Sequence, residues 1–449
     1  MFLIKPIKMN LKKLLVQSLV FRSLYFVSML LVNVFLSRFL QASATGNLYY
    51  LTTIFGFIQL VASISLEAGI TFFASGKIIS FNKLLWLSIT WSFIIALLVL
   101  TGSFVYLYYI KHSPPYDVMQ YCFFSVCYIT GILLATCCCV LFYAQGNYYL
   151  PNILLVLLNA AFVLTMPFSG HSGDDKLVNM VVYRYFLLFF LQGILLALVF
   201  IVKNKSWQQF GLPGSGQLKK LAKYSLTALS ANVIFYLVYR IDYWFVHINT
   251  ASCTESDLGN YIQVSKLGQL FLIVPQIIAS VIFPKSAGTS DRSEISTSIM
   301  IIARLFSQMF LVVIVITSLF GGKLFTIVFG ETFNRMQVPF LIIIPGIFCL
   351  SVLALLSAYF SGKGNLKVGV VGAAIALLVV IAGDYFLVPL YGIIGAAVVS
   401  TIGYFVNLLY SLLRFYKDYS LSWSDFFRWK KSDFTWLSSL FKNKASADA

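Results

Sequence analysis

The sequence predicts an all-α integral membrane protein with about twelve transmembrane helices. These helices are expected to form two parallel six-helix halves around a central cavity, with both termini in the cytoplasm. Of the 449 residues, 60% are hydrophobic and only 10% are charged, whereas soluble domains carry about 25% charged residues. Apolar runs long enough to cross a bilayer recur along the chain. Lysine and arginine gather on one side of these runs, as the positive-inside rule requires.

The expected spans are windows of about 20 mostly apolar residues. They cover residues 14–40, 47–74, 84–110, 118–144, 151–168, 177–202, 223–248, 258–283, 299–320, 337–360, 367–388 and 391–414. With the amino terminus inside, 23 lysines and arginines flank the cytoplasmic ends of the spans. The outer ends have five, namely Arg38, Lys111, Lys176, Lys323 and Arg335. This asymmetry predicts that both termini are cytoplasmic.

The domain organisation follows from these spans. Residues 1–203 are the expected N-terminal six-helix bundle, and residues 223–415 are the expected C-terminal bundle. Residues 204–222 join them as a cytoplasmic linker, whose glycine, proline and serine content predicts flexibility. Residues 416–449 form a basic amphipathic tail that is expected to lie on the inner leaflet. The net charge of +17 fits these flanks, so we expect membrane lipids and no nucleic acid as partners.

The two halves carry the same landmarks at similar spacing. A Gly-Asn pair enters the second span of each half, and another Gly-Asn pair follows the fourth. These pairs are Gly46 and Asn47, Gly259 and Asn260, Gly146 and Asn147, and Gly364 and Asn365. The first two pairs lie 213 residues apart and the last two lie 218 apart. Parallel repeats of this kind usually enclose a substrate path, so the plan is typical of a transporter.

Several motifs carry a family resemblance. They are "PLYGIIGAA" (389–397), the preceding "GKGN" (362–365), "FGETFNRMQVPFLIIIPG" (329–346), "GNYIQVSKLGQL" (259–270) and the aspartate of "YRIDYWFV" (239–246). In order and spacing the chain resembles the polysaccharide-biosynthesis flippases of the multidrug/oligosaccharidyl-lipid/polysaccharide exporter superfamily. The twelve expected spans are more similar to the O-antigen-type members than to the lipid II flippases, which have fourteen.

The resemblance implies a function. It implies a flippase that moves undecaprenyl-diphosphate-linked oligosaccharide from the cytoplasmic to the periplasmic leaflet of the bacterial inner membrane, by alternating access. The glycan would serve O-antigen, capsule or another surface polysaccharide, with a polymerase and other assembly proteins as partners. A multidrug/cation antiporter of the same superfamily is the main alternative. A polymerase or ligase would be an enzyme with a long periplasmic loop, which the sequence lacks, so we expect neither catalytic residues nor a metal site.

Seven ionisable side chains fall inside the expected spans, where each costs at least about 2.5–3.5 kcal/mol at the bilayer centre. Arg22, Arg184 and Arg240 are the candidate diphosphate-binding residues, because a guanidinium matches phosphate oxygens in a bidentate manner. Tyr236 and Tyr243 share the helical face of Arg240 and are possible sugar contacts.

The remaining four are Glu67, Asp242, Lys266 and Asp384. They are candidates either for interhelical ion pairs or for the binding of a coupling proton or sodium ion. The sequence leaves these alternatives open, and no other cofactor is expected. Among possible pairs, depth in the membrane favours Glu67 with Arg22, Asp242 with Lys266 or Asp384, and Asp384 with Arg240.

Overall fold

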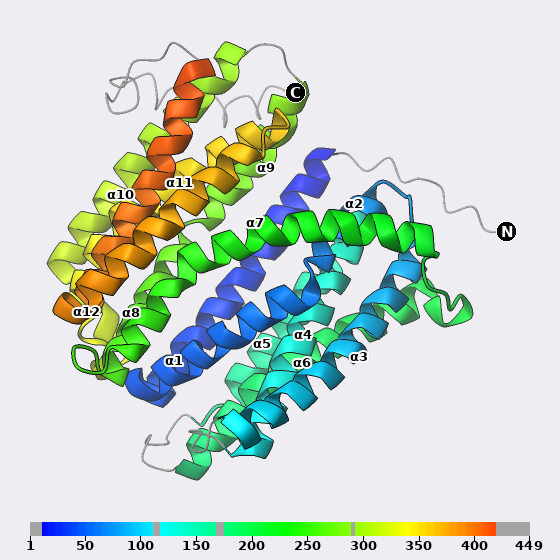
Figure 1. Cartoon of the computed structure of the whole chain (residues 1–449), viewed down its shortest axis with the longest axis horizontal. Helices are drawn as coiled ribbons and strands as arrows, with labels where there is room; N and C mark the ends of the chain where they lie inside the picture. Colours follow the sequence, from blue (N-terminus) through cyan, green and yellow to red (C-terminus); the bar gives the residue numbers. More distant parts are fainter. Residues whose placement is uncertain (1–10, 111–116, 168–174, 289–291, 419–449) are drawn as a thin grey trace, which may run out of the picture. The chain divides into compact units, whose positions relative to one another are not determined.

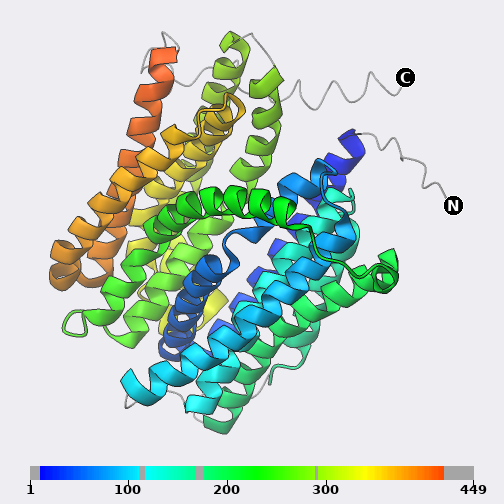
Figure 2. The same ribbon diagram turned by 45° about the vertical axis from the view of Figure 1, so that its right-hand side comes forward.

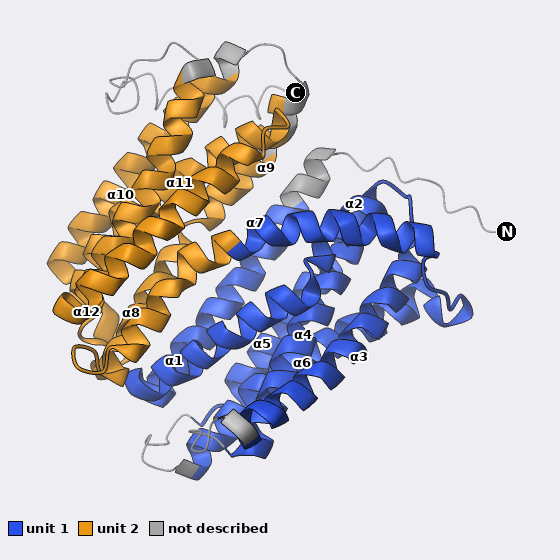
Figure 3. Ribbon diagram, viewed as in Figure 1, with its two compact units in different colours: residues 1–233 blue, residues 234–449 orange. Residues whose placement is uncertain are grey.

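The computed structural model describes residues 11–110, 117–167, 175–288 and 292–418, and every regular element in these ranges is a helix (Figure 1). The chain divides into two compact units, residues 1–233 and 234–449 (Figure 3). Their border lies within helix α7 (Ser215–Ile248), inside the region expected to be the first span of the C-terminal bundle. The amphipathic tail predicted for residues 416–449 lies largely outside the described residues, since α12 ends at Asp418.

The first unit contains six helices and the beginning of α7. They are α1 (Leu11–Ser63), α2 (Leu66–Ser75), α3 (Phe81–Val105), α4 (Val118–Ala144), α5 (Tyr149–Leu164) and α6 (Asp175–Asn204). A π-helical turn extends α3 over Tyr106–Ile110, and a 3-10 turn, Ser206–Gln208, follows α6. Helix α4 packs against α3 and α6, and α1 packs against α5.

The second unit continues from α7. Its helices are α8 (Glu255–Leu270), α9 (Ile273–Gly288), α10 (Arg292–Phe329), α11 (Gln337–Gly362) and α12 (Lys367–Asp418). A 3-10 turn, Glu331–Phe333, separates α10 from α11. Helix α11 is the central element of this unit, because it packs against α8, α9, α10 and α12.

Every expected span falls mainly on helix, and nine of the described helical segments are long and apolar enough to cross a membrane. The chain is therefore a multi-pass membrane protein. Two long helices each hold two expected spans and bend sharply between them. The bend in α1 is at Gln41 (φ 61°, ψ 178°), and the bend in α12 is at Gly392 (φ 56°, ψ −136°). The number of crossings and the side of the termini stay predictions.

Two expected spans are not continuous helices. The window 47–74 breaks at Ile64 and Ser65, which both adopt left-handed backbone angles between α1 and α2. The window 258–283 breaks at Phe271 and Leu272, between α8 and α9. Each break interrupts the second expected span of its half. Discontinuous helices at matching places in two repeats are a usual feature of transporter folds.

The Gly-Asn pairs at 146–147 and 364–365 form turns of the same geometry. Gly146 and Gly364 have φ values of 75° and 74°, which favour glycine. The amide of Asn147 donates to the carbonyl of Phe142 at 2.9 Å, and the amide of Asn365 donates to that of Phe360 at 2.8 Å. In both cases a helix ends in the left-handed turn typical of C-terminal caps. This repeated turn supports the repeat seen in the sequence.

The segment that joins α6 to α7 is held in place, although its composition predicts a flexible linker. Ser206 and Gln209 both form hydrogen bonds with the side chain of Asn82, at the beginning of α3. In Figure 2 the segment follows the end of α6 and leads directly into α7. The linker is thus part of the first unit.

Candidate functional site

A buried carboxylate lies at the centre of the second unit. Asp242 of α7 is 0% exposed, and its Oδ2 atom accepts hydrogen bonds from the hydroxyls of Tyr261 (2.5 Å) and Ser400 (3.0 Å). Its Oδ1 accepts from the backbone amide of Tyr243 at 2.9 Å. Tyr261 comes from α8 and Ser400 from α12, so Asp242 joins three helices. A buried polar network of this kind is stable only when each acceptor oxygen receives a hydrogen bond.

Asp384 is the second buried carboxyl group of this unit. It lies on α12 before the bend at Gly392 and is 0% exposed. Within the described part of the chain, neither of its carboxyl oxygens has a hydrogen-bond partner. It interacts electrostatically with Asp242 and with Tyr261. An unsatisfied buried carboxylate is costly, and a proton or a bound cation would reduce this cost.

Two basic side chains of this unit, Arg240 and Lys266, lie near each other, and Arg240 also lies near Asp242. Arg240 donates from Nη1 to the hydroxyl of Tyr243 (2.7 Å) and from Nη2 to the amide oxygen of Gln269 on α8 (2.9 Å). Its guanidinium carbon lies 5.2 Å from the centre of the Tyr243 ring. Lys266, one turn before Gln269 on α8, is close enough to interact electrostatically with Arg240, and Arg240 also interacts with Asp242. The structure therefore brings Arg240 near both Lys266 and Asp242.

The hydrogen bonds of Asp242 go to neutral groups. Asp242 lies near Asp384, as one of the sequence alternatives had it, but it is bonded to Tyr261 and Ser400. Asp384 has no hydrogen bond to Arg240. Tyr243 is fully buried and binds Arg240, whereas the other candidate sugar contact, Tyr236, is partly exposed on α7.

Arg22 occupies a different environment, in the first unit. It is exposed, and its guanidinium lies 5.6 Å from the centre of the Tyr143 ring. The Tyr143 hydroxyl in turn donates to Asn152 at 3.1 Å, and its ring stacks on Tyr148. A guanidinium held over an aromatic face keeps its donors available for an anion. No ion pair between Arg22 and Glu67 occurs within the residues that the structure describes.

Glu67 and Arg184 have local surroundings of their own. Glu67 lies in the first turn of α2, and its buried Oε2 has no hydrogen-bond partner among the described residues. Arg184 donates to the backbone oxygen of Thr165 at 2.7 Å, just after the end of α5. A cation at a helix C-terminus is stabilising, so this contact gives Arg184 a structural role beside its predicted one.

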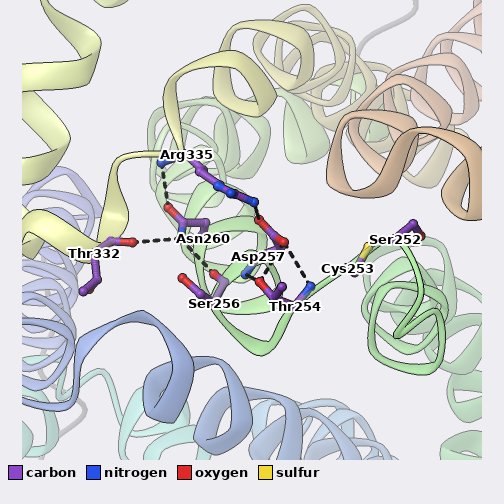
Figure 4. Close-up of polar contacts among 8 residues, drawn as sticks. All are labelled: Ser252, Cys253, Thr254, Ser256, Asp257, Asn260, Thr332 and Arg335. Atoms are coloured by element: carbon purple, nitrogen blue, oxygen red, sulfur yellow. Dashed lines mark hydrogen bonds and ion pairs between the residues drawn. The ribbon is translucent and has the colours of Figure 1, made fainter.

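A further polar cluster joins the beginning of α8 to the junction of α10 and α11 (Figure 4). Thr254 and Asp257 form a reciprocal capping box at the first turn of α8. Arg335 donates to Asp257 Oδ1 at 2.8 Å, and its backbone amide donates to Asn260 Oδ1 at 3.2 Å. The Asn260 amide donates to the backbone oxygen of Thr332 at 3.1 Å. These groups satisfy one another within the cluster, which indicates a structural clamp.

Sequence reasoning missed the neutral partners. Tyr261, Ser400 and Gln269 hold the ionisable groups, and two of them, Tyr261 and Gln269, lie inside the motif 259–270 that the resemblance uses. Arg304, one of the 23 lysines and arginines assigned to the cytoplasmic ends of the spans, is 4% exposed on α10. No cluster of three or more histidine, cysteine, aspartate or glutamate side chains occurs in the described ranges. Asp242, Asp384 and Ser400 offer only oxygen donors, which suit a proton or a hard cation.

Comparison with solved structures identifies the fold. The lipid II flippase MurJ, in an inward closed conformation, matches with a TM-score of 0.68 and 13% identity over 88% of this chain and 87% of its own. A mutant of the Vibrio cholerae MATE transporter VcmN matches with a TM-score of 0.64 and 15% identity, over 92% and 98% of the two chains. A MOP superfamily transporter from Pyrococcus furiosus, with a binding pocket of reversed polarity, matches with a TM-score of 0.61 and 13% identity over 89% and 94%.

Other comparisons found no relative. No protein-family model matches the chain, and no curated protein sequence does. These three structural matches are all below 25% identity, and they share their fold with this chain over most of its length. The chain therefore has the fold of the MOP superfamily transporters.

Proposed function

We propose that this protein is a flippase for lipid-linked oligosaccharides. Its substrate would be an undecaprenyl-diphosphate-linked repeat unit, which it moves from the cytoplasmic to the periplasmic leaflet of a bacterial inner membrane. The two halves would expose the substrate path to each side in turn. Polymerases and other surface-polysaccharide assembly proteins would use the product. The proposal is supported by the fold, which this protein shares with a lipid II flippase. It adds to the fold a class of substrate.

The observation that carries the proposal is the fixed guanidinium of Arg240 in the second unit. Arg240 Nη1 donates to the Tyr243 hydroxyl and Nη2 donates to the Gln269 amide oxygen. These bonds orient the planar guanidinium, whose geometry matches phosphate oxygens in a bidentate manner.

The driving force would come from the two buried carboxyl groups of this unit, one of which, Asp242, lies near Arg240. Asp384 has no hydrogen-bond partner in the described part of the chain, and Asp242 lies within electrostatic reach. A proton or sodium ion bound between them would relieve the repulsion of two buried carboxylates. The proximity of Asp242 to Arg240 would then couple ion binding to substrate binding, because each changes the electrostatic energy of the other.

A cation antiporter is the second candidate, and the same carboxyl groups favour it. A cationic drug would bind Asp384 directly, as an opposite charge that satisfies a buried carboxylate. The fold is shared with the MATE transporter VcmN as well as with the lipid II flippase. The two candidates differ in which charged residues touch the substrate.

The test is a flipping assay in proteoliposomes with a defined fluorescent polyprenyl-diphosphate glycan. We expect protein-dependent movement of the glycan between leaflets, and no movement of a fluorescent phosphatidylcholine. In the cell, deletion of the gene should leave lipid-linked repeat units on the cytoplasmic face. A purified protein that exports an organic cation but flips no diphosphate lipid would replace the proposal with the antiporter.

A further inference from the structure

The linker between α6 and α7 has a fixed conformation on the first unit. The Ser206 hydroxyl donates to Asn82 Oδ1 at 2.8 Å, and Asn82 Nδ2 donates to Gln209 Oε1 at 2.9 Å. The indole nitrogen of Trp86 donates to the backbone oxygen of Ser206 at 3.3 Å. The linker is thereby fixed at two points to the first two turns of α3, which begins at Phe81.

The fixed linker lies at one end of the helices of this unit. Helix α6 ends where the linker begins, and α3 begins beside it. The Tyr224 ring of α7 stacks on Phe72 near the end of α2. In a multi-pass protein, the ends of spans lie where the hydrocarbon core meets the headgroups. The linker is therefore at the depth of the lipid headgroups.

The surface around the linker is basic. We define the linker face as the exposed side chains of residues 77–83 and 203–223. Its lysines are Lys77, Lys83, Lys203, Lys205, Lys219, Lys220 and Lys223, and all are exposed. These two segments contain no aspartate or glutamate. The positive charges of these lysines are not balanced by any acidic residue in the same two segments. This imbalance indicates an anionic partner.

Apolar side chains also stand exposed on the linker face. Trp207 is 53% exposed, Phe210 is 71% exposed and Leu212 is 43% exposed. One edge of Phe210 contacts the ring of Trp86, with ring centres 4.8 Å apart, so its exposed position is defined. Aromatic side chains flanked by lysines are typical of the membrane–water interface, where the rings sit among the headgroups.

We propose that the linker face is a binding site for anionic phospholipid headgroups of the leaflet that it meets. The lysines would attract the phosphates, and Trp207, Phe210 and Leu212 would insert at the level of the upper acyl chains. A lipid surface fits better than a soluble protein, because the apolar side chains lie at headgroup depth and the lysines flank them on both sides. The bound lipids would hold the linker, and with it the beginning of α7, against α3.

The test measures lipid binding without transport, so its result is independent of the proposed flippase function. The purified protein in an uncharged detergent is titrated with dioctanoyl phosphatidylglycerol and, separately, with dioctanoyl phosphatidylcholine. Bound lipid is counted by native mass spectrometry. We expect the native protein to prefer phosphatidylglycerol. Each lysine near a membrane surface contributes roughly five-fold in affinity, so the triple variant Lys205→Gln, Lys219→Gln, Lys220→Gln should lose roughly 100-fold for this lipid alone.

Matched variants separate this site from general basicity. The double variant Lys323→Gln, Lys367→Gln removes exposed lysines from the other unit and should bind both lipids as the native protein does. Trp207→Ser should weaken both lipids to a similar extent, since it removes apolar contact and no charge. Thermal unfolding of each variant checks that it folds. The proposal is overturned if the native protein binds both lipids equally, if the triple variant keeps its affinity, or if inorganic phosphate displaces the lipid at equal concentration.

Discussion

At the scale of single residues, Arg240 combines a charge with neutral support. Its two guanidinium nitrogens are oriented by Tyr243 and Gln269, at 2.7 and 2.9 Å. If it binds a diphosphate, Arg240→Ala removes a charged hydrogen bond worth about 1.5–3 kcal/mol. We expect affinity for a polyprenyl diphosphate to fall by about 10- to 150-fold. Arg240→Lys should restore only part, because an ammonium lacks the planar fork. Binding is measured by titration of the purified protein in detergent.

A control distinguishes binding from folding. Arg335→Ala removes an exposed arginine of the same unit, whose side chain is 65% exposed and pairs with Asp257. It should leave diphosphate affinity unchanged. If Arg240→Ala lowers the thermal midpoint and leaves the affinity of the remaining folded protein intact, then Arg240 is structural. The binding hypothesis would then rest on Arg22 and Arg184.

Sequence reasoning found the ionisable residues and missed what holds them. A charge within an apolar run is visible in one dimension, and on that basis Asp242, Asp384 and Arg240 were singled out. Their partners come from other helices, and the rotation of one helix against another is set by packing that no single run reveals. Hence the Arg22–Glu67 pair was wrong, while Tyr261 and Ser400 were not foreseen as partners of Asp242.

At the scale of helices, the contact between α4 and α6 depends on two glycines. A Cβ atom on Gly131 would lie 2.4 Å from the backbone oxygen of Phe189, and one on Gly193 would lie 2.6 Å from the oxygen of Gly131. Backbone atoms cannot move aside as a flexible side chain can. Gly131→Ala should therefore push the helices apart and cost about 1–3 kcal/mol. Thermal unfolding in detergent measures the loss.

Gly102 is the matched control for this prediction. It lies within α3, and a Cβ atom there would meet nothing within 4 Å. Gly102→Ala should leave stability unchanged or raise it by up to about 1 kcal/mol, because alanine favours helix. Equal losses for the two variants would mean that close approach of α4 and α6 is not the reason for Gly131.

The clamp at the beginning of α8 yields a second prediction for helices. Asp257 accepts hydrogen bonds from Thr254 as well as from Arg335. Asp257→Ala therefore removes the N3 side of the capping box together with the Arg335 pair, and each lost hydrogen bond is worth about 0.5–1.5 kcal/mol. Arg335→Ala breaks only the ion pair, whose arginine is 65% exposed, and leaves the capping box in place. We expect the larger fall in thermal midpoint for Asp257→Ala, and the reverse order would contradict the capping role.

The helices themselves were predictable where composition decides, and their interruptions were not. The expected spans were recognised as windows of apolar residues, because the hydrocarbon core of a bilayer requires predominantly apolar side chains. The break between α1 and α2 occurs at Ile64 and Ser65, where neither glycine nor proline marks it. The bend at Gly392, by contrast, was signalled by the Pro-Leu-Tyr-Gly sequence in which it lies.

At the scale of the whole molecule, the two halves share a plan but differ in charge. The turns at Gly146 and Gly364 have equivalent geometry. The second unit, however, brings Asp242 near both Asp384 and Arg240, whereas in the first unit Arg22 and Glu67 lie in separate surroundings. A coupling site in one half would be sufficient, because an ion that binds there stabilises the conformational state in which that site is accessible.

This asymmetry gives a test of the two candidate functions with one pair of variants. Asp384→Asn keeps the shape of the side chain. It removes the negative charge, and with it the capacity to bind a proton or a sodium ion. In a flippase, this variant should still bind a polyprenyl diphosphate, and its transport should lose its response to an imposed proton or sodium gradient. Arg240→Ala should lose diphosphate binding. In an antiporter, Asp384→Asn should instead lose binding of a cationic drug such as ethidium, while Arg240→Ala should keep it. Both ligands are titrated against both variants, and gradients are imposed across proteoliposomes. Native-like binding and gradient response in Asp384→Asn would exclude Asp384 as the coupling site.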